Sequence, residues 1–136
     1  MIRDEFQKAI YDILVAADFG LNDPAIYDYV PTNEPYPFVA IGDIDYRSWQ
    51  TDESNGYRGE ARIWAYSDKP GRRQVNDLID VIDVALDRAT PDMDNGHVIT
   101  IDRISSATSV DVDSADNQIR SGRVDFSFII GVNSDE

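Results

Sequence analysis

The chain has 136 residues, with 26 Asp plus Glu against 12 Lys plus Arg, which gives a formal net charge of −14. Such a charge disfavours nucleic-acid binding, which depends on cationic side chains, and the absence of cysteine excludes disulfide frameworks, thiolate zinc sites and cysteine nucleophiles. The length is that of one domain, so we expect residues 1–136 to form a single domain. Apolar runs stay far below the roughly 20 residues of a membrane helix, so we expect a soluble protein without a membrane partner.

Aspartate dominates the acidic residues, and the chain has only two lysines, Lys8 and Lys69. Aspartate is a weak former of helices and strands, so propensity does not explain its use in place of glutamate. One hypothesis is a halophilic protein in a high-salt environment, where salt screens self-repulsion and hydrated carboxylates keep the chain soluble. The alternative is an acidic protein adapted to ordinary salt, and the composition favours neither.

The first predicted elements are a helix and two strands. Apolar residues recur at three- and four-residue steps from Ile2 to Ala17, which predicts an amphipathic helix that stops before Gly20. Residues 26–30 are rich in β-branched and aromatic side chains, and the prolines that follow indicate an edge strand and a turn. Residues 38–46 carry apolar side chains on both faces, which suits a strand covered on much of both sides.

A polar stretch at residues 47–58 separates this strand from the next. It is too long for a tight turn and contains the turn pair Asn55-Gly56, so we expect a protruding hairpin loop. Side-chain alternation predicts a strand at 60–66. Residues 75–89 follow the 3.6-residue period closely and predict a second helix, which ends at Thr90-Pro91.

The last third of the chain predicts three strands, at 97–104, 106–112 and 119–132. The third has the clearest signal, because apolar side chains alternate over nine residues from Val124 to Val132. We therefore expect an α+β fold, in which two amphipathic helices pack on one face of a mostly antiparallel sheet of about six strands. The predicted element order is α-β-β-β-α-β-β-β.

The residues that could carry chemistry favour a structural interpretation. His97 is the single histidine; it follows a turn pair, has no nucleophile elbow nearby and is interpreted as an exposed turn residue. The acidic loops at 92–96 and 111–116 lack the glycine position and the glutamate of a calcium loop. Four aspartates of the second helix could reach a metal ion, but a solvated helix face is the simpler interpretation; they are Asp77, Asp80, Asp83 and Asp87. We predict no catalytic residue, no metal site and no cofactor.

A candidate partner-binding surface lies in the polar stretch. Trp49 and Tyr57 have no obvious core role there, and Arg47 and Arg58 flank them. Aromatic residues and arginine are enriched at the centres of protein interfaces, so these four residues are predicted to contact a partner. The alternative is that Trp49 folds back onto the sheet.

Two further arginines, Arg72 and Arg73, stand at the start of the second predicted helix. The amino end of a helix prefers anions, so cations there are unfavourable unless an acidic group compensates them. That group is either an outside partner, such as an Asp-rich face of a neighbouring copy, or a local carboxylate of Asp68 or Asp77.

Several short runs, spread over nearly the whole chain, resemble one protein family. They are Tyr29-Val30-Pro31, Tyr36-Pro37-Phe38-Val39-Ala40-Ile41-Gly42, Trp49 with Thr51, Ile63-Trp64, Gly71-Arg72, Ala85-Leu86 and the closing stretch 121–128. Together they resemble the tail completion or tail terminator proteins of long-tailed phages and related tailed viruses. The high aspartate content and the scarcity of lysine depart from the family's pattern.

The resemblance implies a small structural α+β subunit, made in the host cytoplasm and placed in the virion at the head-proximal end of the tail. Such subunits form a ring, typically a hexamer, that caps the tail tube protein and joins the head connector, while DNA passes through without being read. The absence of a recognisable active site agrees with a non-enzymatic role. Alternatives are a neck or head-completion protein on the head side of the joint, an acidic DNA mimic that inhibits a nucleic-acid enzyme, and an enzyme of unidentified type.

Overall fold

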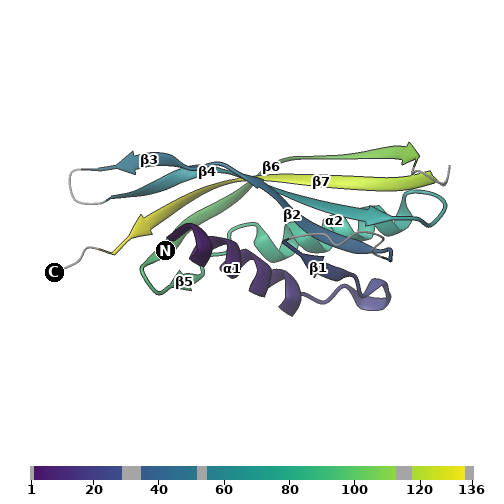
Figure 1. The fold of residues 1–136 in the computed structure, drawn as a ribbon, viewed down its shortest axis with the longest axis horizontal. Coiled ribbons are helices and arrows are strands. Elements are labelled where there is room, and N and C mark those ends of the chain that lie inside the picture. Colours follow the sequence, from purple (N-terminus) through teal and green to yellow (C-terminus); the bar gives the residue numbers. More distant parts are fainter. Residues whose placement is uncertain (1, 29–34, 52–54, 113–117, 134–136) are drawn as a thin grey trace.

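The computed structural model describes residues 2–28, 35–51, 55–112 and 118–133 (Figure 1). In chain order the elements are α1 (Ile2–Ala16), the short 3-10 helix η1 (Gly20–Asn22), β1 (Ala25–Tyr27), β2 (Phe38–Ile44), β3 (Arg47–Gln50), β4 (Asn55–Ser67), α2 (Arg73–Leu86), β5 (Asp92–Met93), β6 (Gly96–Val112) and β7 (Gln118–Val132). The predicted α+β class, with two α-helices and a mostly antiparallel sheet, is confirmed.

The described strands form one sheet in the order β1-β2-β4-β7-β6-β5, and β3 pairs with the first four residues of β4. Within this sheet β1 and β2 run parallel, whereas the other pairs are antiparallel. The central strands β4 and β7 are paired without a register shift from Asn55–Val132 to Ser67–Arg120. This long central ladder spans most of the molecule in Figure 1.

Side-chain alternation in β7 separates the two faces of the sheet. Its buried face consists of Val124, Phe126, Phe128 and Ile130. α1 contacts this face through Phe6, whose ring centre lies 4.3 Å from that of Phe128. α2 crosses the same face at Gly122, where a Cβ would lie only 2.7 Å from Cγ1 of Ile79, so the missing side chain allows close packing. Figure 1 shows both helices on one side of the sheet; we call the opposite side the outer face.

Two polar contacts tie the first turn of α1 to neighbouring elements. The Arg3 guanidinium lies 5.2 Å from the ring centre of Tyr46 and 5.3 Å from that of Tyr57. The Glu5 carboxylate accepts hydrogen bonds from the side-chain amide of Asn95 at 2.6 Å and from its backbone N–H at 2.7 Å. These hydrogen bonds stabilise the charged form and hold the pKa of Glu5 below its usual 4.5.

The predicted order of elements differs from the structure in three places. The strands expected at 97–104 and 106–112 are a single strand, β6, with register shifts between Val98 and Thr100 and between Arg103 and Ser105. A shift of one residue moves every later side chain to the opposite face of the sheet. The alternation of apolar and polar residues in one irregular strand therefore resembles that of two separate strands. The expected loop at 47–58 contains β3, and the short strand β5 was not predicted.

Two predicted boundaries also differ from the structure. α2 ends at Leu86, before the expected residue 89, because Asp87 adopts an extended conformation and Arg88 a left-handed one with φ of 64°. Its N–H donates to the carbonyl of Ile101 in β6 at 2.6 Å, in place of continuing the helix. β1 covers Ala25–Tyr27, and the predicted residues 29–30 lie outside the described part of the chain.

Candidate functional site

Three of the predicted partner-binding residues lie together on the β3–β4 hairpin. Arg47 is paired directly with Arg58, and Trp49 with Gly56. Residues opposite each other, or two apart on one strand, share a face, so Arg47, Trp49 and Arg58 form one surface, which we call the hairpin patch. Both arginines are exposed and Trp49 is half-buried. Among the described residues neither arginine forms an ion pair.

Tyr57, the fourth predicted residue of this region, points to the other face of the hairpin. It is half-buried at the edge of the core, and its ring centre lies 6.1 Å from that of Tyr46 in an edge-to-face arrangement. The guanidinium of Arg3 from α1 lies against both rings. Tyr57 thus holds α1 to the sheet and is separated from the hairpin patch by the backbone of β4.

Arg72 and Arg73 lie far from the hairpin patch, at the opposite end of β4. The 13 residues of β4 separate the two regions, which at about 3.3 Å per residue is about 40 Å. Both arginines are exposed. Within the described residues neither pairs with Asp68 or Asp77, so the local compensation considered from the sequence is absent there. The six predicted residues therefore do not form one surface.

The residues considered for chemistry have other positions. His97 is exposed beside Gly131, where a Cβ would approach its Cε1 to 2.8 Å. The Asp83 carboxylate of α2 pairs with the Arg103 guanidinium, and the carboxylate of Asp87, the residue just after α2, accepts the Arg103 backbone N–H at 3.0 Å. Among the residues that the structure describes, no three His, Cys, Asp or Glu side chains are grouped as metal ligands would be.

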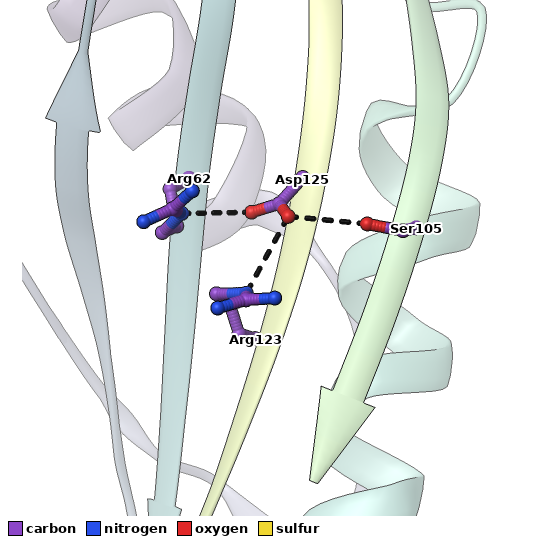
Figure 2. Close-up of polar contacts among 4 residues, drawn as sticks. All are labelled: Arg62, Ser105, Arg123 and Asp125. Carbon is purple, nitrogen blue, oxygen red and sulfur yellow. Dashed lines mark hydrogen bonds and ion pairs between the residues drawn. The ribbon is translucent and has the colours of Figure 1, made fainter.

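The outer face carries a polar cluster that the sequence reasoning missed (Figure 2). Asp125 of β7 is only 8% exposed and accepts hydrogen bonds from Arg62 Nε of β4 at 2.9 Å and from Ser105 Oγ of β6 at 3.1 Å. Arg123 Nε lies 3.4 Å from the second carboxylate oxygen. One buried carboxylate thus joins three neighbouring strands. The alternation of side chains in β7 indicates that Asp125 lies on the face opposite the core. Its hydrogen-bond partners depend on how β7 is aligned with β4 and β6, which the sequence does not reveal.

A row of aromatic rings lies next to this cluster on the outer face. The sequence reasoning missed this row as well. Ring centres are 5.3 Å apart between Tyr36 and Phe38, 4.8 Å between Phe38 and Tyr66, and 6.1 Å between Tyr66 and Trp64. The Arg123 guanidinium lies 5.9 Å from the centre of the Trp64 ring. Burial raises the pKa of Tyr66, and the nearby Asp111 carboxylate raises it further.

The outer face suits contacts with proteins, because the helices leave it uncovered. It carries exposed or half-buried arginines and aromatic rings, and Phe38 within the aromatic row is only 7% exposed. None of the described helices has the length and apolar character needed to cross a bilayer. The described residues thus supply hydrogen-bonding, charged and aromatic groups that can bind a partner protein.

Comparisons with known proteins identify the relatives of this chain. A family model described as tail completion protein gp17 matches residues 8–131. Among solved structures, a chain in the virion of the native gene transfer agent (GTA) particle is similar, with a TM-score of 0.77, 22% identity and coverage of 98% of each chain, which shows a shared fold. The comparison with curated proteins finds no match. Because the family model covers most of the sequence, the chain belongs to the tail completion protein gp17 family and is a structural protein of the virion tail.

Proposed function

We propose that copies of this chain form a ring at the head-proximal end of the tail tube. The ring, which we expect to be a hexamer, ends polymerisation of the tube protein and provides the surface to which the head connector or neck protein binds. In this proposal residues 1–136 act as one domain, and no bond is made or broken. The observation that carries the proposal is the tail completion family match over residues 8–131.

The distribution of exposed groups supports a role in assembly. The hairpin patch lies at one end of β4, and Arg72 and Arg73 lie at the other, so the subunit offers contact groups at two separate places. A ring subunit needs two different surfaces, because each copy contacts one neighbour on each side. A further surface must meet the tube, and the aromatic row of the outer face is of suitable composition.

The charge of the chain supports passage of DNA through such a ring. Six copies at −14 each would carry a large negative charge, and repulsion from phosphate would reduce adhesion of DNA to the wall. DNA would then pass without being read, as a channel requires.

The test is the position of the protein and the consequence of its loss in the particle that carries it. A labelled copy should lie at the junction of head and tail in electron micrographs. Particles made without the protein should have tails of irregular length and heads that are not joined. A label on the head side of the joint, with tails of normal length, would instead identify a neck protein. Tails that are normal in length and joined without the protein would overturn the proposal.

A binding experiment distinguishes the proposed assembly role from the alternative of an acidic DNA mimic. The purified protein is immobilised and incubated with a lysate of infected cells, and retained proteins are identified by mass spectrometry. Retention of the tube or connector protein supports the assembly role. Retention of a nuclease, with neither tail protein bound, contradicts it.

A further inference from the structure

A cleft lies at the end of the molecule opposite the hairpin patch. It has a volume of about 770 Å³ and runs between the segment after α1 and the first turns of α2. Its lining includes Asp18, Phe19, Arg73, Asp77 and Asp80. We call it the helix cleft. Because the loop after β4 leads directly into α2, the helix cleft lies at the end of β4 opposite the hairpin patch. Figure 1 shows the two ends of β4.

One wall of the helix cleft is acidic. Asp77 and Asp80 follow Arg73 on α2 at steps of four and three residues, so they lie on one side of the helix. Both are exposed, and neither forms an ion pair with a described residue. Val84 stands one turn further along the same side and is 82% exposed, more than any other large apolar residue described. The wall thus carries two unpaired carboxylates and Arg73, and Val84 stands on the same side of α2 just beyond the lining of the cleft.

The hairpin patch is complementary to this wall. It carries the unpaired cations Arg47 and Arg58 beside the half-buried ring of Trp49. Two copies of a chain with net charge −14 repel each other, so a stable contact between them must place cations against carboxylates. Arginine can bind a carboxylate through two parallel hydrogen bonds, and Trp49 offers a large apolar surface to a residue such as Val84.

We infer that the hairpin patch of one subunit docks into the helix cleft of a second copy of this chain, with Arg47 and Arg58 against Asp77 and Asp80. The inference rests on the proposed ring and specifies which surfaces build it. The two surfaces differ, so the contact is head-to-tail and repeats around a ring when the rotation between subunits closes.

Cysteine cross-linking tests the contact, because the natural chain has no cysteine. Gln50→Cys is placed beside the hairpin patch and Lys69→Cys in the lining of the helix cleft; both positions are exposed. Assembled particles carrying both substitutions are treated with a short bis-maleimide. The docked arrangement predicts a covalent ladder whose largest species is the complete ring. Each single variant alone should remain monomeric, and an equal mixture of the two should stop at dimers.

Reversal of single charges provides a second test of the docking. Arg58→Asp and Asp80→Arg should each lower the number of joined particles about tenfold, and the double variant should recover most of that loss, because it restores an opposite pair. Asp12→Arg, on the exposed side of α1, is the matched control for adding a cation elsewhere. Circular dichroism confirms that each variant folds.

The outcomes distinguish this inference from the proposed function. If labelled protein lies at the tail end but the double cysteine variant stays monomeric in assembled particles, the docking is wrong and the ring must use other surfaces. Equal losses for single and double charge variants would also contradict the docking. If the protein is absent from the tail end, the proposed function itself fails.

Discussion

Trp49 lies directly opposite Gly56 in the β3–β4 hairpin, and its ring lies over the place that a side chain at residue 56 would occupy. A Cβ there would approach Trp49 Cε3 to 3.2 Å and would collide with the backbone carbonyl of Ile130. The same glycine therefore permits β4 to pair closely with β7 and lets the indole ring lie against the hairpin.

Gly56→Val should destabilise the protein by about 1–3 kcal/mol, because the added side chain forces the backbone of β4 away from Ile130. Thermal unfolding followed by circular dichroism measures the loss. Adding Trp49→Ala should not rescue the variant, because the more severe collision is with the backbone. Full rescue would show that the indole ring is the limiting contact.

Asp125→Ala should destabilise the protein by about 1–3 kcal/mol, because the substitution leaves the Arg62 and Arg123 guanidinium groups without their buried anion. Denaturant titration gives the free energy of unfolding. The matched control is Asp12→Ala, which removes the exposed Lys8–Asp12 pair on α1 and should change the free energy of unfolding little, because exposed ion pairs contribute little to stability. Equal effects at the two positions would contradict a structural role for the Asp125 cluster.

The segments with a strong side-chain period were predictable from the sequence. The expected helix at 2–17 corresponds to α1, and the expected strand at 119–132 to β7, each within one residue at its ends. Apolar residues recur in these segments with one fixed period, because a single face of each element is buried. The hairpin strand β3 was missed because its four residues are mostly polar and exposed, so they carry no such signal.

The candidate site was less predictable, because it depends on which strands become neighbours. Arg47, Trp49 and Arg58 were identified by composition, but Tyr57 was grouped with them although alternation in β4 turns it to the other face. The Asp125 cluster joins residues as far apart as Arg62, 63 positions away. Only the paired register of β4, β7 and β6 reveals such contacts.

The hydrogen bonds of Glu5 predict a pH dependence of stability. Because the pKa of Glu5 is lowered in the folded state, its ionised form stabilises the protein above the usual value of 4.5, and this contribution is lost as the pH falls through the lowered pKa. Glu5→Gln should therefore lower the melting temperature at pH 7, and the difference from the natural protein should shrink as the pH is lowered toward 3. A difference that does not change with pH would contradict the assignment to Glu5.

Salt should raise the melting temperature, because the chain carries a net charge of −14 and its like charges repel each other. Exposed charges interact over about 10 Å at 0.1 M salt but over only about 3 Å at 1 M. Repulsion between surface aspartates therefore falls steeply over this range of salt concentration. Melting curves in 0.1, 1 and 2 M potassium chloride measure the effect. The variant Asp77→Asn with Asp80→Asn removes two unpaired charges and should respond less to salt. A continued rise up to 2 M would support the high-salt hypothesis, whereas an unchanged melting temperature would discard it in favour of an acidic protein adapted to ordinary salt.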